Sequence, residues 1–463
     1  MSQQPPMESS GSAKASLHRT IFRLHFYAGL IIAPFVLILA ITGTIYLYGT
    51  EIEDIVHPDW RFVEQAGPHL PADIIIDNAL RSFPGASATR ADLPTSPDRT
   101  AVVFLTPGAG EPFRAYVDPV SGEVLGSFIY GHTLVGFADQ MHGSLLMGER
   151  GDLIVELAAC WAIVLIVTGL YLWWPRTQNK VWGVFLPRWG KGRLFWRDLH
   201  PVVGIWTSGL IMFLTLTGLP WASNWGGNLE RAMANMGLGY PASYRIHIDH
   251  GAAGSDPDKT LAETTPGIPW TMEPAPAPHS AHAQHMPISV RDAVQVFAHE
   301  GLTTAYRLTL PGDAHDVFTA YTYPDQPEGQ RTLHIDQYTG EVINDVSFGD
   351  YGIGAKAVEW GVAIHMGNYF GAPNQLIMLV ATLGAATLSL SAPLMWLSRR
   401  KIGLGAPKPL HSGRALWSII ALLAMLGLLF PTLGISVLCV LALERLVLRR
   451  IEPLRIWLGL FTP

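Results

Sequence analysis

The chain has 463 residues, of which 49% are apolar, and a formal net charge of -6. Its length exceeds that of one ordinary soluble domain, and the apolar residues gather in runs too long for soluble helices. The negative and positive residues lie in different regions, so the charge gives no indication of a nucleic-acid partner. Cys160 and Cys439 both fall within apolar runs, which excludes a disulfide framework in the polar connections. Any bound cofactor must therefore use other ligands.

The apolar runs predict membrane-spanning helices. Four of them, 29–48, 154–174, 200–222 and 376–397, are close to the roughly 20 residues that a helix needs to cross hydrocarbon. A fifth run, 416–448, is interrupted by Pro431 and Gly434 and predicts two short helices of about 15 residues each. We therefore expect a polytopic α-helical membrane protein with about six transmembrane helices.

Basic residues mark one side of these spans. Lys14, Arg19 and Arg23 precede the first span, and further Lys and Arg fill 176–197 and 399–414. The positive-inside rule places these segments in the cytoplasm and the two long, acidic connections in the periplasm. The first span has no small-residue cleavage site behind it, so we expect it to remain as an anchor.

The predicted organisation follows from these spans and loops. In chain order it is a cytoplasmic tail (1–17), the first span (18–48), a periplasmic domain (49–141), an outer histidine segment with the second span (142–175), a cytoplasmic loop (176–197), the third span (198–222), a second periplasmic domain (223–362), an outer histidine segment with the fourth span (363–398), a cytoplasmic loop (399–414), a two-helix hairpin (415–448) and a cytoplasmic tail (449–463).

The two halves of the chain repeat one another. His25, Gly29 and Thr42-Gly43 in the first span recur as His200, Gly204 and Thr217-Gly218 in the third, with identical offsets. Equivalent positions in a duplication have equivalent roles, so residues that recur are the first candidates for a shared function.

The long connections repeat as well. Residues 117–124 and 335–342 alternate in polarity around a Gly turn and predict a β-hairpin in each half. His142 and His365 follow these hairpins at the predicted outer side. Residues 254–287 are dense in Pro, Ala and His and predict a flexible insertion without a packed core, in which His279, His282 and His285 have no fixed geometry for a metal.

Histidine beside a membrane span is costly without a partner, which makes the four matched histidines functional candidates. We expect His25 to face His200 at the cytoplasmic side and His142 to face His365 at the outer side. Two facing imidazoles suit one iron porphyrin, so the spans predict a four-helix haem-binding core. The alternative is that these histidines are interfacial polar residues.

Small and basic residues near the histidines fit the same hypothesis. Gly29 and Gly204, one helical turn from His25 and His200, would leave room for a flat macrocycle. The Thr42-Gly43 and Thr217-Gly218 pairs lie about 26 Å farther along each helix, where they could allow close approach of an outer haem. Arg23, Arg193 and Arg197 could pair with the propionates of an inner haem, although the positive-inside rule alone would also place them there. The glycines could instead serve tight helix packing.

Several motifs together resemble those of a known family. They are Leu24-His25 with Thr42-Gly43, the segment 141–146 (Met-His-Gly-Ser-Leu-Leu), the segment 168–175 (Thr-Gly-Leu-Tyr-Leu-Trp-Trp-Pro), Asp198-Leu199-His200 with Thr217-Gly218, and the two Gly-Glu-Val turns. Over about residues 16–400 the chain resembles the PepSY-associated transmembrane family of bacterial inner-membrane proteins, which includes iron-regulated members and ferric-siderophore reductases.

The resemblance implies two PepSY-type α+β domains in the periplasm and, in reductase members, two b-type haems. The histidine positions of the family correspond to His25, His142, His200 and His365. The chain departs from the family pattern at Ser391-Ala392-Pro393, which stands where the second span has Thr-Gly.

The function expected from these features is transmembrane electron transfer. A quinol or a cytoplasmic reductase would supply electrons, and a ferric siderophore in the periplasm would accept them, which makes the chain a haem-dependent oxidoreductase for iron release and uptake. No flavin or nicotinamide fingerprint is present, so a separate donor is expected. The alternative is a non-enzymatic PepSY membrane protein, either a metal permease or a sensor that binds peptide or regulates a protease. A transporter would be expected to carry more intramembrane carboxylates than Glu156.

Overall fold

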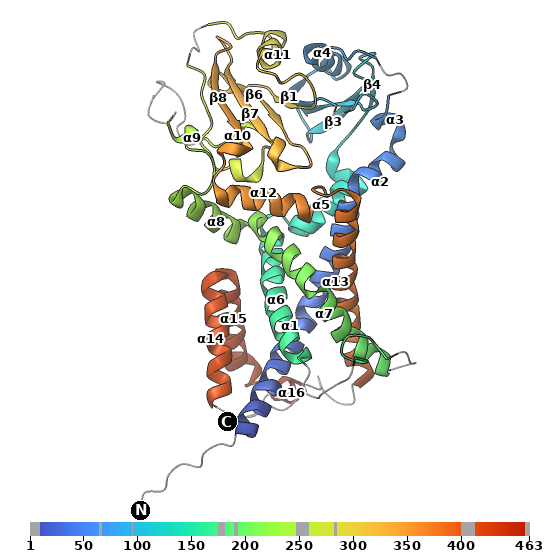
Figure 1. Cartoon of the computed structure of the whole chain (residues 1–463), viewed down its shortest axis with the longest axis vertical. Helices are drawn as coiled ribbons and strands as arrows, with labels where there is room; N and C mark the ends of the chain where they lie inside the picture. The colour runs from blue at the N-terminus through green and yellow to red at the C-terminus, as the bar shows by residue number, and fades with distance from the viewer. Residues whose placement is uncertain are drawn as a thin grey trace, which may run out of the picture. The chain divides into compact units, whose positions relative to one another are not determined.

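The computed structural model describes residues 10–63, 67–94, 96–174, 181–188, 193–246, 259–281, 285–399 and 413–458. These form two units (Figure 1). Unit 1 takes in Met1–Thr44, Gln140–Gly227 and Leu376–Pro463, and unit 2 takes in Ile45–Asp139 and Asn228–Gln375.

The core of unit 1 consists of four long helices, α1 (Ser10–Leu47), α6 (Glu149–Trp173), α7 (Arg193–Gly218) and α13 (Ala372–Arg399). A buried cluster formed by Ala40, Ile211 and Ala385 lies between them. At Gly384 of α13, a Cβ atom would lie 2.6 Å from the Thr207 side chain of α7, so only glycine permits this approach. Small residues of this kind allow close packing where no water drives helices together.

Five stretches of the described chain are long and apolar enough to cross a membrane. They are Ser16–Leu47, Glu149–Trp173, Phe195–Trp221, Ala372–Leu397 and Pro431–Leu448. The first four agree with the spans expected from the sequence. Of the two helices expected in the last run, the second reaches this length among the described residues, and Ile419–Leu429 of the first is a shorter apolar stretch. The chain is a multi-pass membrane protein.

The C-terminal hairpin consists of α14 (Gly413–Leu429) and α15 (Pro431–Leu443), separated at Pro431 as predicted. A buried carboxylate, Glu156 of α6, accepts a hydrogen bond of 2.7 Å from the Thr432 hydroxyl of α15. The indole of Trp161 donates to the Ser436 hydroxyl at 3.0 Å. Polar groups that would be costly in hydrocarbon therefore attach the hairpin to the four-helix core.

Unit 2 contains one antiparallel sheet of eight strands in the order β4-β3-β2-β1-β5-β6-β7-β8. The strands are β1 (Ala86–Asp92), β2 (Ala101–Pro107), β3 (Phe113–Val117), β4 (Val124–Phe128), β5 (Arg307–Thr309), β6 (Val317–Thr322), β7 (Arg331–Asp336) and β8 (Val342–Ser347). Each half of the chain supplies four neighbouring strands, and β1 pairs with β5 at the centre, where Ala91 is opposite Leu308. The two predicted α+β domains thus share a single sheet, because each would otherwise expose a central edge.

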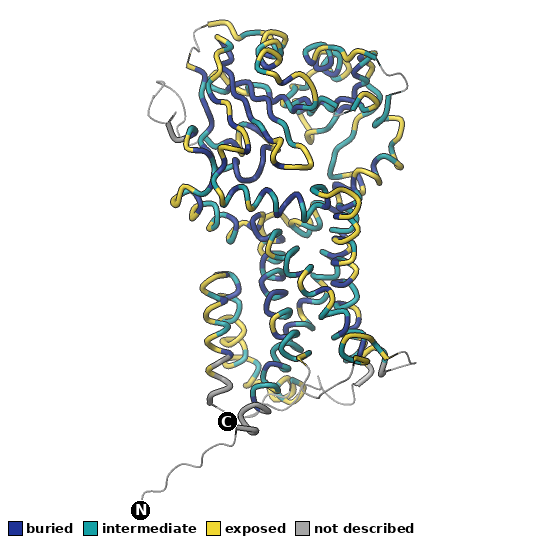
Figure 2. Tube along the Cα trace, in the orientation of Figure 1, coloured by how far each residue is buried: buried dark blue, intermediate teal, exposed yellow. Residues whose placement is uncertain are grey.

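The duplication is visible in the details of this sheet. The predicted hairpins are confirmed, with β3 paired to β4 and β7 paired to β8. Gly122 and Gly340 have φ angles of 78° and 72° in the two turns, which favours glycine there. Helices α4 (Ala72–Ser82) and α11 (Val290–His299) cover the same apolar face of the sheet. In the colouring of Figure 2, β6 and β7 are mostly buried, whereas β1 and β4 are mostly intermediate.

The remaining helices are short. They are α2 (Gly49–Val56), α3 (Pro58–Arg61), α5 (Leu134–Ser144), α8 (Ser223–Met236), α9 (Ser243–Ile246), α10 (Leu261–Thr264), α12 (Ile353–His365) and α16 (Glu452–Trp457). Of these, α5 and α12 matter most for function, because His142 lies in the last turn of the first and His365 ends the second.

The predicted insertion at 254–287 is not a loose loop where the structure describes it. Leu261, Met272 and Ala275 are completely buried in a second apolar cluster with Tyr244 and Phe348. The prediction of a segment without a packed core is therefore wrong for residues 259–281. The prediction was based on a composition rich in alanine and proline, but Ala275 and Ala277 of this segment pack in one cluster with Val346 of the sheet.

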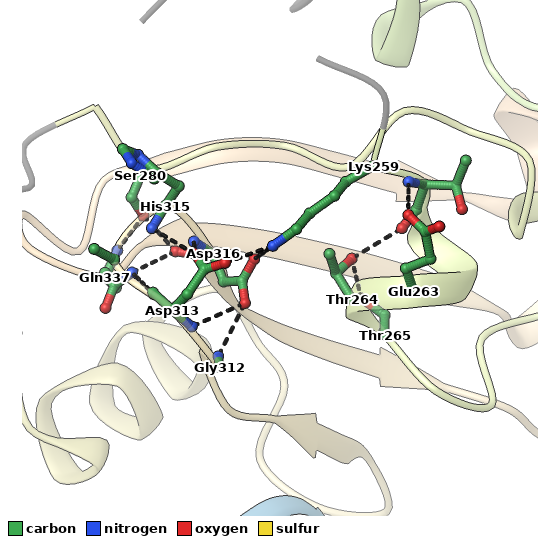
Figure 3. Close-up of polar contacts among 12 residues, drawn as sticks. Lys259, Glu263, Thr264, Thr265, Ser280, Gly312, Asp313, His315, Asp316 and Gln337 are labelled. Atoms are coloured by element: carbon green, nitrogen blue, oxygen red, sulfur yellow. Dashed lines mark hydrogen bonds and ion pairs between the residues drawn. The ribbon is translucent and has the colours of Figure 1, made fainter. Parts of the chain in front are cut away.

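Polar contacts fix the same segment to the loop before β6 (Figure 3). Lys259 forms an ion pair with Asp313 at 2.5 Å and lies 3.5 Å from Asp316. The Ser280 hydroxyl donates to the carbonyl oxygen of Asp316, and the Gln337 amide donates to the same carbonyl at 2.7 Å. The insertion is thus attached at both ends of its described part. His282 lies outside the described residues.

Candidate functional site

Two of the four matched histidines face each other inside unit 1. The ring centres of His25 in α1 and His200 in α7 are 6.3 Å apart, and the ring planes are nearly perpendicular at 83°. Both rings line one cavity of about 480 Å³ between the four long helices. The sequence-predicted pairing of His25 with His200 is confirmed as a spatial relationship.

A hydroxyl group from a neighbouring helix holds each ring. Nδ1 of His25 lies 2.9 Å from the Thr168 hydroxyl of α6, and Nδ1 of His200 lies 2.9 Å from the Ser391 hydroxyl of α13. The Thr168 hydroxyl donates its only proton to the carbonyl oxygen of Val164 at 2.6 Å, and Ser391 donates to Leu388 at 3.2 Å. Each hydroxyl therefore accepts a hydrogen bond from Nδ1–H of the imidazole.

This arrangement determines which ring nitrogen is available. An imidazole protonated on Nδ1 carries its lone pair on Nε2, so Nε2 is the nitrogen that can bind a metal. The hydroxyl contacts of both rings are made by Nδ1 and do not occupy Nε2. Both histidines are thus oriented as neutral ligands.

The space between the rings fits a porphyrin iron. A metal held at about 2 Å by Nε2 of each ring would place the two ring centres roughly 6 Å apart, close to the spacing observed. Two imidazoles alone cannot complete a metal site, and among the described residues no group of three or more His, Cys, Asp or Glu is placed to hold a metal. A bound porphyrin would supply the further nitrogen ligands.

The walls of the cavity have the character that such a group needs. Gly29 and Gly204 both line it, and a Cβ atom at either would meet only one leucine side chain, at 3.7 Å. The other lining residues are largely apolar, with Phe22, Phe26 and Trp396 among them. The volume lies within the range of about 300–1,000 Å³ typical of cofactor and ligand sites.

His142 is held in the same way as the inner pair. Its Nδ1 lies 3.1 Å from the Thr42 hydroxyl of α1, which donates to the Ile38 carbonyl at 2.8 Å. The backbone of the neighbouring Gly43 approaches the ring closely, since a Cβ atom there would be 2.9 Å from Cε1 of His142. The sequence-predicted Thr42-Gly43 pair therefore contacts the predicted outer histidine.

The corresponding residues of the second half fall in different units. Thr217 and Gly218 end α7 in unit 1, where the Thr217 hydroxyl donates to the Phe213 carbonyl at 2.7 Å. His365 ends α12 in unit 2. The pairing of His142 with His365 stays a prediction.

Two of the three arginines proposed for the propionates are described, and they have different surroundings. Arg197 lines the cavity and lies 3.6 Å from the buried Asp198, which Arg188 also binds through two hydrogen bonds of 2.6 and 2.8 Å. The guanidinium of Arg23 lies 5.3 Å from the ring centre of Tyr27, and Arg23 is not among the residues that line the cavity. The position of Arg197 fits the prediction better. The side chain of Arg193 lies outside the described residues.

Three residues of this site were not among the sequence-predicted candidates. They are Thr168 and Gly169 of α6 and Ser391 of α13, and a Cβ atom at Gly169 would lie 3.2 Å from Cε1 of His25. The signal was present in the sequence, because each of the first three spans contains a Thr-Gly pair. The apparent departure at Ser391 keeps the hydroxyl that holds His200.

Residues 22–399 match the family model described as PepSY-associated TM region. No curated protein matches the chain. The match includes all four histidines and both halves of the sheet, and it ends before the α14–α15 hairpin.

Proposed function

The chain belongs to the PepSY-associated TM family, and from the paired histidines of its membrane core we propose that it binds two b-type haems and carries electrons across the bacterial inner membrane. The proposed acceptor is a ferric siderophore in the periplasm, and the proposed donor is a quinol or a cytoplasmic reductase. One observation carries the proposal: His25 and His200 face each other across one cavity, each with Nδ1 held by a hydroxyl and Nε2 available.

The residues of the chain have distinct roles in this proposal. His25 and His200 would hold the inner iron, and Thr168 and Ser391 would keep both rings in the ligating tautomer and orientation. Arg197 at the cavity would pair with a propionate. His142 and His365 would hold the outer iron in the same manner.

Bound haem would supply reversible one-electron chemistry at a potential set by its axial ligands and surroundings. Each ferric ion takes up one electron and becomes ferrous, so a two-electron donor such as a quinol would serve two ferric ions and release two protons. Ferrous iron is held more weakly by hard oxygen ligands, which would favour its release from the siderophore. The apolar lining of the cavity would keep water from the inner iron.

The test is the absorption spectrum of the full chain purified from haem-replete cells, with a haem count per chain. We expect two low-spin b-type haems that are reduced by a quinol analogue and reoxidised by a ferric siderophore. His25→Ala should lose the inner haem alone and His142→Ala the outer haem alone, while both keep the membrane fold.

A colourless preparation would refute haem binding and favour a non-enzymatic role as a permease or sensor. Full haem content in both variants would refute the assignment of these ligands. Haem that is reduced but never reoxidised by any ferric chelate would refute the proposed acceptor while leaving the cofactor intact.

A further inference from the structure

Unit 2 carries a row of alternating guanidinium groups and aromatic rings on the sheet face opposite α4 and α11. Arg114 of β3, Phe104 of β2 and Arg90 of β1 are directly opposite one another in register across three strands. Arg90 lies 3.7 Å and Arg114 lies 5.0 Å from the centre of the Phe104 ring. Tyr130 extends the row, since Arg114 lies 3.8 Å from its ring centre.

The row continues across the seam into the second half of the chain. Arg307 of β5 lies opposite Asp92 of β1, and its guanidinium lies 5.1 Å from the Tyr323 ring and 5.8 Å from the Tyr321 ring. We call Arg90, Arg114, Arg307 and their rings the arginine row. It combines residues of both halves on one face of the shared sheet.

Two of the three arginines have clear structural partners. Arg90 forms an ion pair with Asp92 at 2.7 Å and donates to the Pro266 carbonyl at 2.5 Å. Arg307 lies 3.8 Å from the same Asp92 and donates to the Gly267 carbonyl at 3.3 Å. They therefore share one carboxylate and also hold the insertion against the sheet.

Arg114 differs from them. Among the described residues its side chain forms no ion pair and no hydrogen bond, and its guanidinium contacts the rings of Phe104 and Tyr130. Ring stacking uses the flat faces of a guanidinium and leaves its N–H edges as donors. Burial raises the pKa of the nearby Asp139, although Tyr130 and Arg114 act in the opposite direction. The raised pKa disfavours the negatively charged form of this carboxyl, which would otherwise balance the charge of Arg114.

The arrangement has more positive than negative charge where it is partly withdrawn from water. Asp92 pairs with both Arg90 and Arg307, which leaves the charge of Arg114, the other neighbour of Phe104, without a paired carboxylate among the described residues. A stacked guanidinium with free donor edges is pre-organised for anionic oxygens, which it binds by charge-assisted hydrogen bonds.

We propose that the arginine row binds a multiply charged anionic oxygen chelate of a trivalent metal ion, with Arg114 as its direct contact. This inference rests on the proposed function, because it names the charge class of the electron acceptor. It favours catecholate and carboxylate chelates of iron and disfavours neutral or cationic hydroxamate chelates.

Gallium(III) chelates test the binding without the redox step, because gallium(III) has the charge and ligand preference of iron(III) but is not reduced. The full chain in lipid nanodiscs is titrated with gallium tris-catecholate, gallium citrate, cationic gallium desferrioxamine and inorganic phosphate. We expect the two anionic chelates to bind, with affinity falling as salt rises because exposed charges are screened.

Arg114→Gln should weaken binding of the anionic chelates about tenfold, which corresponds to the loss of about 1.4 kcal/mol, and Arg114→Lys should recover part of it. The control is Arg291→Gln on α11, which removes an exposed ion pair with Asp73 on the apolar side of the sheet. It should bind as the unaltered chain does. Thermal unfolding of each variant separates loss of the site from loss of the fold.

Equal binding of the cationic chelate, or of phosphate alone, would overturn the proposed ligand class. Unchanged anionic binding in a folded Arg114→Gln chain would overturn the role of Arg114 and leave the row a structural feature. A colourless chain that still binds the anionic chelates with this charge dependence would refute the haem proposal and leave the arginine row standing.

Discussion

Removing the hydroxyl that holds His25 tests the inner site most directly. Thr168→Val keeps the shape of the side chain but deprives Nδ1–H of its acceptor at 2.9 Å. A buried donor left unsatisfied costs about 1–3 kcal/mol, and loss of such an outer partner weakens metal binding by about 10–100-fold. The two ranges agree, so we expect haem at the His25–His200 site to dissociate 10–100 times more readily.

The assay is transfer of haem to excess apomyoglobin, followed by absorbance, together with the midpoint potential of each haem. The control is Thr387→Val on α13. The Thr387 hydroxyl donates a hydrogen bond of 2.7 Å to the backbone carbonyl of Leu383, so this variant also removes a hydroxyl from a helix. It should leave both haems unchanged. If Thr168→Val released haem no faster than Thr387→Val, the hydroxyl would not hold the ligand and the argument from tautomer would fail.

Three further predictions each concern the replacement of one residue. Gly43→Ala should displace the His142 ring, because the added Cβ would lie 2.9 Å from Cε1, and spectra of the purified variant should show loss of one haem with the inner haem retained. Burial and then the nearby Glu230 and Glu359 raise the pKa of Glu273 to about 7, so its contribution to stability is present below about pH 4.5 and is lost as pH rises through 7. Glu273→Gln should therefore leave thermal unfolding nearly unchanged at pH 4 and stabilise the chain by about 3 kcal/mol at pH 8, because the raised pKa corresponds to about 1.4 kcal/mol per pH unit. An equal effect at both pH values would contradict the assignment. Thr432→Val should leave the buried Glu156 with one hydrogen bond fewer and lower the free energy of unfolding by about 1–3 kcal/mol. Limited proteolysis should then cleave the α14–α15 hairpin sooner than the four long helices.

Much of the fold follows from sequence patterns that depend on local chemistry. Apolar length predicts the four long helices, and the duplicated Gly turns predict the two hairpins correctly. These features are set by hydrocarbon thickness and by backbone conformation, both of which act over a few residues.

The pairing of both halves in one sheet could not be predicted from local sequence patterns. Nothing in the seven residues of β1 indicates that Arg307–Thr309 will pair with them, since strand partners are chosen by tertiary packing. The insertion was misjudged for a similar reason, because the cluster that buries Leu261 and Met272 includes Val346 and Phe348, which are distant in sequence.

The candidate site likewise contains residues that could be predicted from the sequence and residues that could not. His25 and His200 could be paired from the repeat alone, and Gly29 and Gly204 followed from helical spacing. The hydroxyl of Ser391 could not be assigned, because its place opposite His200 depends on how α7 packs against α13. Comparison of motifs therefore identified Ser391 only as a departure from the family pattern, although serine retains the hydroxyl that contacts His200.

The pairing of β1 with β5 also constrains the order of assembly. The partner of β1 on this side is β5, which begins at Arg307. During synthesis this edge of β1 therefore stays unpaired until the third span and the insertion have been made. Contacts so far apart in sequence form slowly, and exposed edges invite association with other chains. Each half on its own would present the same edge, so an isolated half is suited to pairing with a second copy of itself. The seam thus has the geometry of a dimer interface whose two partners are joined in one polypeptide, with the arginine row spanning the junction.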